Sequence, residues 1–206
     1  MGLKYRTDKS YLHNFLHFYE PYLSAYRNAK INLLEIGILQ GASLKMWAEY
    51  FPRGSITGGD IHDKSHLDNE RIQTLTFDQE NENDLRNILD QFDIIIDDGG
   101  HSMKQQQLTL KVLFRNNLKA AGIYIIEDLH TSFSLQHGST STNNTINLIE
   151  DLQTGATRPQ ADYYINNNIF QELHEYIIYS EIYRSRCGYG LYLNGCRSIT
   201  CILKKK

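Results

Sequence analysis

Short apolar runs alternate with helix-like segments through the first two thirds of the chain. Five of these runs lack the alternation of polar and apolar positions that marks a half-exposed strand: residues 31–37, 55–61, 72–77, 92–97 and 121–128. Strands of this kind, separated by helices, are typical of a parallel sheet that is covered on both faces. The pattern therefore predicts a doubly wound α/β domain.

Apolar positions three or four residues apart predict the helices between these strands. They occur over 11–26 (one or two helices), 42–51, 82–92 and 104–118, and near 146–152. Two β-rich segments, around 174–183 and 197–203, close the chain, and "SRCGYGLYLNGC" reads as a long connection between them. The two segments suit an antiparallel hairpin at the edge of the sheet.

Length and charge narrow the class of protein. The chain has 206 residues, enough for one domain with a sizeable core, and its 41% hydrophobic and 22% charged residues are ordinary for a globular protein. The formal net charge of −3 does not favour binding to a polyanion, and the basic run 204–206 reads as a solvated chain end. We therefore expect no nucleic-acid partner.

The cysteines and the N-terminus indicate the compartment. Cys187, Cys196 and Cys201 are odd in number and lack a C-x-x-C spacing, which argues against a disulfide framework and a structural zinc site. The N-terminus has no apolar signal-peptide core, and no run approaches the 18 apolar residues of a membrane span. We expect a cytoplasmic protein that does not bind a membrane.

Ligands of open α/β sheets bind beyond the carboxyl ends of the strands. The loop after the first predicted strand runs from Glu35 to Ser43 and contains Gly37 and Gly41, which allow a ligand to approach the backbone before a helix begins. Tight strand-to-helix turns need such glycines in any case. The loop matches neither the phosphate-binding G-x-x-x-x-G-K-[ST] pattern nor a full G-x-G-x-x-G.

Acidic and amide side chains follow the second and third predicted strands. Asp60 lies 23 residues beyond Gly37, the distance at which an acid accepts hydrogen bonds from ribose hydroxyls. Asp78 and Gln79 are placed to contact an adenine edge. Helix capping is the alternative role for Asp60 and Asp78. Together these residues favour a cofactor that contains a nucleoside.

The fourth and fifth predicted strands end in "DDGGH" and "EDLH". If the strands are neighbours, about 4.8 Å apart, four carboxylates crowd together: Asp97, Asp98, Glu127 and Asp128. They would repel one another unless a cation lies among them, and oxygen ligands favour magnesium, calcium or manganese over zinc. Helix capping explains one acid at each strand end but not two. His101, three residues beyond Asp98, is a candidate general base or substrate contact; a solvated loop position is the alternative.

These segments together resemble the class I S-adenosylmethionine-dependent methyltransferases. The resemblance rests on the order and spacing of "LLEIGILQGASLKMWAEYFP", "GGDI", "FDQEN", "FDIIIDDGGH" and "GIYIIEDLHTS". It is greatest to the magnesium-dependent sugar O-methyltransferases of macrolide and rhamnosyl-polyketide tailoring, with the related cephalosporin-tailoring group, and it covers about residues 5–133. The second glycine of "DDGGH" stands where serine is common, and Gly59 where an aliphatic residue is common.

The resemblance implies a role for each matching position. The cofactor-binding set is Glu35, Gly37, Gly41, Ser43, Asp60, Asp78 and Gln79, joined by Thr7 and Lys9 of an N-terminal "TDK…H" pattern that ends at His13 and helps to close the cofactor or acceptor site. The metal ligands are Asp98, Glu127 and Asp128, with Asp98 and His101 as the catalytic pair. Asp97 is left to cap or brace its loop.

The expected protein is a single Rossmann-like methyltransferase domain over residues 1–206, with a mostly parallel seven-stranded sheet and a C-terminal antiparallel hairpin. It divides into an N-terminal helical cap (1–30), a cofactor- and metal-binding core (31–133), and a lid loop with the C-terminal strands (134–206). The polar tract 134–145 is either that lid or an ordinary exposed loop.

The expected reaction is transfer of a methyl group from S-adenosylmethionine to a sugar hydroxyl, dependent on magnesium or another divalent cation. The acceptor is a small molecule, and association into a homo-oligomer fits the family. Three alternatives stay open: a methyltransferase for another small polar acceptor such as a phosphoramidate or a diol, a non-catalytic nucleoside-binding subunit, and an NAD-dependent oxidoreductase. The missing G-x-G-x-x-G pattern and the paired acids argue against the last.

Overall fold

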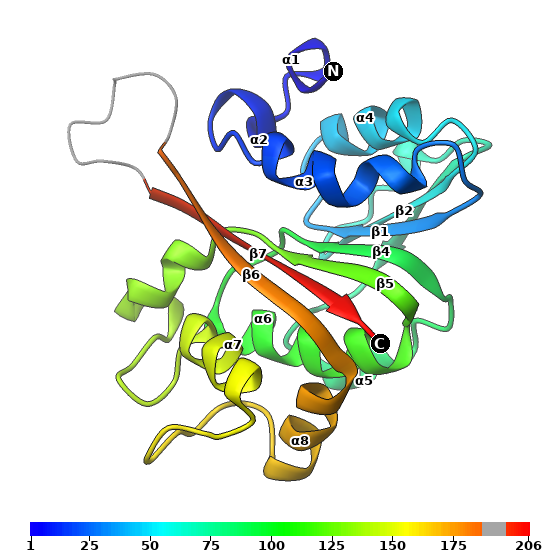
Figure 1. Cartoon of the computed structure of the whole chain (residues 1–206). Coiled ribbons are helices and arrows are strands. Elements are labelled where there is room, and N and C mark those ends of the chain that lie inside the picture. The colour runs from blue at the N-terminus through cyan, green and yellow to red at the C-terminus, as the bar shows by residue number, and fades with distance from the viewer. Residues whose placement is uncertain (187–196) are drawn as a thin grey trace.

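A seven-stranded sheet in the order β3-β2-β1-β4-β5-β7-β6 forms the centre of the molecule (Figure 1). The computed structural model describes residues 1–186 and 197–206. The strands are β1 Asn32–Ile36, β2 Ser55–Asp60, β3 Ile72–Thr76, β4 Phe92–Asp97, β5 Leu118–Ile126, β6 Ile177–Arg186 and β7 Arg197–Lys205. Neighbours among β1 to β5 pair in parallel, and β7 pairs antiparallel with both β5 and β6. The predicted mostly parallel sheet with an antiparallel C-terminal pair is confirmed.

Helices cover both faces of this sheet (Figure 1). On one side lie α1 Gly2–Tyr5, α2 Asp8–Tyr11, α3 Leu16–Leu23 and α4 Ala42–Tyr50; on the other lie α5 Glu82–Arg86, α6 Met103–Thr109, α7 Thr145–Thr154 and α8 Asn167–Tyr176. Each face of the sheet has its own apolar core. In β4, for example, Ile94 and Ile96 pack toward the first side and Ile95 toward the second. This double burial explains why the strands lack polar alternation.

Two predicted helices differ from the observed elements. The segment 82–92 was expected to be helical throughout, but α5 ends at Arg86. Beyond it, the buried amide of Asn117 donates to the carbonyls of Ile88 (2.6 Å) and Asp90 (2.9 Å), so a distant side chain satisfies backbone groups that a helix would otherwise pair. The predicted helix 104–118 is α6 continued by a π-helical segment, Leu110–Phe114.

The chain after Asn144 contains one helix that the sequence pattern did not predict. Helix α8 is capped by Asn166, whose side chain accepts from the backbone N–H of Ile169 at 3.0 Å. Only Phe170 and Leu173 of this helix are buried. Because α8 extends to Tyr176, β6 begins at Ile177 rather than near residue 174. The long hairpin connection, with Cys187 and Cys196, lies outside the described residues; Cys201 is a buried thiol.

The polar tract 134–145 is anchored to the rest of the molecule. The Ser139 hydroxyl donates to the carbonyl of Ser132 at 2.5 Å, and the Gln107 amide of α6 donates to Asn143 Oδ1 at 2.7 Å. Ser139 and Asn143 are both buried. The lid role of this tract stays a prediction.

Lys205 of β7 closes the carboxyl end of the helix formed by α6 and its π-helical extension. Its ammonium donates to the backbone carbonyls of Phe114 (2.9 Å), Arg115 (3.0 Å) and Leu118 (2.7 Å). The first two carbonyls lie at the helix end, where intrahelical partners are missing, and the third belongs to the first residue of β5. Partial burial lowers the pKa of the Lys205 ammonium.

We expect Lys205→Met to lower the free energy of unfolding by about 2 kcal/mol, because three carbonyls lose a charged donor while the aliphatic stem is kept. Urea denaturation followed by circular dichroism measures this change. Lys206→Met, at the exposed neighbouring position, is the matched control and should unfold as the wild type does. A Lys205→Met midpoint equal to that of the control would remove Lys205 from the cap.

Candidate active site

The order of the strands reverses at β1, with β2 on one side and β4 on the other. Beyond the carboxyl ends of these strands lies a cavity of about 370 Å³, the position at which open α/β sheets bind ligands. Seven of the predicted site residues line it: Gly37, Asp60, Asp78, Gln79, Asp98, His101 and Asp128. The topology thus brings together residues that lie up to 91 positions apart, from Gly37 to Asp128.

The other predicted cofactor contacts lie outside the lining of this cavity. Gly41 is the left-handed cap of α4 at φ 72°, Ser43 is buried in that helix, and Thr7 is the buried cap residue of α2. Glu35 and Lys9 are buried together below the cavity. Their roles toward a cofactor stay predictions.

Gly37 allows the loop after β1 to contact the loop after β4. Its φ is +80°, and a β-carbon there would lie 2.0 Å from the backbone carbonyl oxygen of Asp98. The two strand-end loops therefore pack backbone against backbone. No residue with a side chain fits this position without moving Asp98.

Asp97 and Gln79 brace the loop that carries His101. The Gln79 amide donates to Asp97 Oδ1 at 2.8 Å and to Thr109 Oγ1 at 3.1 Å, and its carbonyl accepts from the N–H of Gly100 at 2.9 Å. Burial raises the pKa of Asp97 to about 7. The hydrogen bond from Gln79 supports a bracing role for Asp97, which does not line the cavity. These partners occupy the polar atoms of Gln79. Asp78 is therefore the better candidate for the predicted polar contact with adenine.

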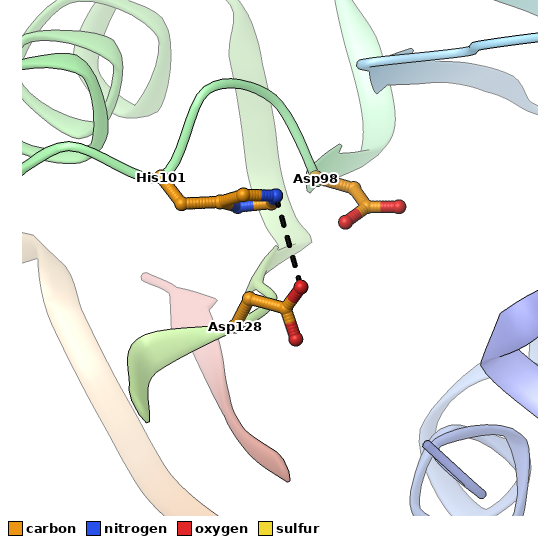
Figure 2. Close-up of side chains that lie close together, drawn as sticks. All are labelled: Asp98, His101 and Asp128. Atoms are coloured by element: carbon orange, nitrogen blue, oxygen red, sulfur yellow. Dashed lines mark ion pairs between the residues drawn. The ribbon is translucent and has the colours of Figure 1, made fainter. Parts of the chain in front are cut away.

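Asp98, His101 and Asp128 lie close together, and Figure 2 shows the His101 imidazole turned toward the Asp128 carboxylate. Each offers a ligand atom, and these atoms lie within 4.8 Å of one another. His101 Nε2 is 3.7 Å from Asp128 Oδ2. His101 adopts a left-handed backbone at φ 61°, and its carbonyl accepts from the Thr131 hydroxyl at 2.9 Å, so the bend after the glycines turns the imidazole back toward the carboxylates.

Lys9 of α2 forms ion pairs with Asp98 of this cluster and with two buried carboxylates, Glu35 and Glu127. Its ammonium lies 2.9 Å from Glu127 Oε1 and 3.2 Å from Glu35 Oε1, and it donates to Asp98 Oδ2. Lys9 is only 1% exposed. The expected metal-ligand set is therefore divided: Asp98 and Asp128 lie beside His101, whereas Glu127 faces Lys9.

One ammonium does not balance this group of acids. Burial works to lower the pKa of Lys9, but the neighbouring carboxylates outweigh it and hold the pKa well above its usual value. Burial, with the charge of Glu127, nevertheless keeps the pKa of Asp98 well above its usual value, and burial raises the pKa of Glu127 to about 7. The carboxyl groups outnumber the ammonium groups, and the raised pKa values of Asp98 and Glu127 mean that ionising all of them together is unfavourable without a further cation.

Comparison with known proteins identifies relatives of this chain. No protein-family model matches the sequence. The chain is 39% identical over 144 residues to mycinamicin VI 2''-O-methyltransferase of Micromonospora griseorubida, covering 65% of this chain and 36% of that protein. It is 37% identical over 153 residues to a Streptomyces olivaceus enzyme, 8-demethyl-8-(2-methoxy-alpha-L-rhamnosyl)-tetracenomycin-C 3'-O-methyltransferase, covering 69% of this chain and 39% of the relative.

A solved structure supports the same relationship. The MycE methyltransferase of mycinamycin biosynthesis, in complex with Mg, SAH and mycinamycin VI, superposes with a TM-score of 0.79 at 28% identity, covering 99% of this chain and 53% of that one. The chain has the class I methyltransferase fold and is a homologue of these sugar O-methyltransferases. It spans little more than a third of the curated relatives and about half of the MycE chain.

Within this methyltransferase fold, the cavity lining also includes residues outside the predicted site set, among them Asp8, Leu39 and Ile61. Leu39 and Ile61 are 74% and 60% exposed, high values for large apolar side chains beside a cavity. Their signals were present, because Ile61 directly follows Asp60 and Asp8 belongs to the "TDK" pattern. Their side chains matter here because they are exposed beside the cavity, and that exposure depends on the fold.

No helix among residues 1–186 and 197–206 is long and apolar enough to cross a membrane. The cytoplasmic location of this methyltransferase homologue stays a prediction.

Proposed function

We propose that this chain transfers a methyl group from S-adenosylmethionine to a hydroxyl group of a sugar, with magnesium or another divalent cation. The proposal rests on one cavity that contains both Asp60, an acid at the position that binds ribose hydroxyls in such folds, and the cluster of Asp98, His101 and Asp128. Homology to O-methyltransferases named for glycosylated macrolide and polyketide acceptors supports the sugar as acceptor.

The cofactor would lie along the carboxyl ends of β1, β2 and β3. Asp60 is held by the backbone N–H groups of His62 (3.0 Å) and Ile38 (3.4 Å), so its carboxylate has a set direction from which to accept ribose hydroxyls. Leu39 and Ile61 supply apolar contact for a base, and Asp78 a polar one. The loop at Gly37 would contact the methionine part.

A divalent cation fits the donor set on chemical grounds. Asp128 Oδ1 is buried and accepts no hydrogen bond; the nearest imidazole nitrogens belong to His130 (3.6 Å) and His13 (3.8 Å). An unpartnered buried carboxylate oxygen is costly unless a cation neutralises it. Asp98 and Asp128 would hold the ion with Glu127 as the third ligand, and oxygen ligands suit magnesium.

The chemistry divides between the bound groups and the chain. When bound, S-adenosylmethionine supplies an electrophilic methyl group, and magnesium lowers the pKa of a hydroxyl in its coordination shell. His101 Nε2 would accept the hydroxyl proton when the methyl group passes from sulfur to that oxygen, and the sulfur would keep the electron pair of the broken bond. Asp128, 3.7 Å from that nitrogen, orients the imidazole and stabilises its protonated form.

The test is an assay of the purified chain with S-adenosylmethionine, magnesium and a panel of glycosylated macrolides, nucleotide sugars, free sugars and diols. We expect a sugar-containing product heavier by one methylene, loss of turnover in EDTA and recovery with excess magnesium. Calorimetric titration should detect S-adenosylhomocysteine and no NAD. Methylation of diols alone, or full turnover in EDTA, would contradict the proposal. Light scattering tests the predicted homo-oligomer.

A further inference from the structure

Lys9 is the one described residue whose ammonium lies inside the carboxylate cluster, and the proposed reaction assigns it no part. It comes from a helix of only four residues, α2 (Asp8–Tyr11), near the beginning of the chain. Its partner Asp98 lies 89 positions away. Lys9 is only 1% exposed, and burying an ammonium costs free energy unless its charge is paired, so this position requires nearby carboxylates.

The sheet explains why three acids meet this lysine. In β1, β4 and β5, alternate side chains point to opposite faces, and Leu33, Ile94 and Ile123 pack on the face covered by α3 and α4. Glu35 follows in the same phase within β1, and Asp98 and Glu127 continue that phase one residue beyond the ends of β4 and β5. All three therefore project toward the N-terminal helices, where Lys9 lies.

Lys9 shares these acids with the cation site. Asp98 belongs to the cluster with His101 and Asp128 and also accepts from Lys9. Both oxygens of Glu35 and Oε1 of Glu127 are buried and form no hydrogen bond, so the ion pairs with Lys9 are the interactions that offset their charge. The ammonium and a divalent ion would thus compete for one pool of negative charge.

We propose that Lys9 is a built-in cation of this site: its ammonium balances Glu35 and the inner oxygens of Asp98 and Glu127, and so weakens and sets the affinity for the divalent ion. The inference rests on the metal-dependent function proposed above. Lys9 is a positioning residue that acts through Asp98 and Glu127. Two opposite expectations follow, because a cation removed near a cation site strengthens binding whereas an anion removed weakens it.

The experiment is calorimetric titration of the whole chain with Mn²⁺. We expect Lys9→Met to bind Mn²⁺ at least about tenfold more tightly than the wild type, Glu35→Gln at least about threefold more weakly, and the double variant within about threefold of the wild type. A purely structural lysine predicts weaker or unchanged binding in Lys9→Met. Lys119→Met, whose ion pair with Asp93 (2.8 Å) lies at the other end of the sheet, is the matched control and should bind as the wild type does.

Thermal unfolding gives a second readout. Without metal, Lys9→Met should melt below Lys119→Met, and Mn²⁺ should raise its melting temperature more than it raises that of the wild type. Weaker Mn²⁺ binding by Lys9→Met, or the same binding in both single variants, would overturn the inference while leaving the proposed function intact. Absence of Mn²⁺ binding by the wild type would overturn both. If Lys9→Met does not fold, unchanged Mn²⁺ affinity in Glu35→Gln overturns the inference alone.

Discussion

Replacing Asp128 by asparagine is expected to reduce methyl transfer at least about 10³-fold while leaving the binding of S-adenosylhomocysteine within about threefold of the wild type. The substitution keeps the shape of the side chain and removes its charge. The substitution therefore removes two contributions of Asp128. The side chain no longer orients His101, 3.7 Å away, and it no longer offers a carboxylate oxygen to a cation. The cofactor half of the cavity, around Asp60, is untouched.

Single-turnover methylation and calorimetric titration measure the two halves of this prediction separately. Asp93→Asn is the matched control, because Asp93 also pairs with a cation, Lys119, but lies at the amino end of β4. It should keep wild-type turnover. More than about a tenth of the turnover left in Asp128→Asn would remove this carboxylate from the catalytic cluster, and a parallel loss of cofactor affinity would indicate a collapsed cavity instead.

Gly37→Ala is expected to cost about 2–5 kcal/mol of folding free energy and to abolish binding of S-adenosylhomocysteine. A left-handed backbone costs a residue with a β-carbon about 1–2 kcal/mol, and overpacking against a fixed neighbour adds about 1–3 kcal/mol. Here the neighbour is the backbone carbonyl of Asp98, 2.0 Å from the new carbon. Relief of the overlap must therefore move the loop that carries Asp98 and His101.

Gly138→Ala separates the two contributions. Its φ of +78° matches that of Gly37, but a β-carbon there would meet nothing within 4 Å. We expect a loss of about 1 kcal/mol and unchanged binding. Urea denaturation and calorimetric titration of both variants provide the comparison. Equal losses in the two would show that the close approach of the two strand-end loops has no energetic weight.

The sequence by itself determined the sheet and the content of its carboxyl edge. Uninterrupted apolar runs are required wherever a strand is covered on both faces, so β1 to β5 could be predicted from the one-dimensional pattern. Because parallel strands end at the same edge, the acids after β4 and β5 had to lie close together. The end of α5 at Arg86 was not predicted, because it depends on the distant side chain of Asn117, and α8 was not predicted either.

Tertiary structure alone decided which acid faces which partner. Neighbouring residues at a strand end point to opposite faces, so Asp97 meets Gln79 on one side while Asp98 meets Lys9 on the other. Glu127 faces Lys9 in the same way, whereas Asp128, beyond the end of β5 and in a left-handed backbone, lies beside His101. The phase of each strand could be followed in the sequence, but the helix that covers each face could not. That placement depends on packing between distant segments, and it pairs Glu35, Asp98 and Glu127 with Lys9 while Asp98 and Asp128 lie beside His101.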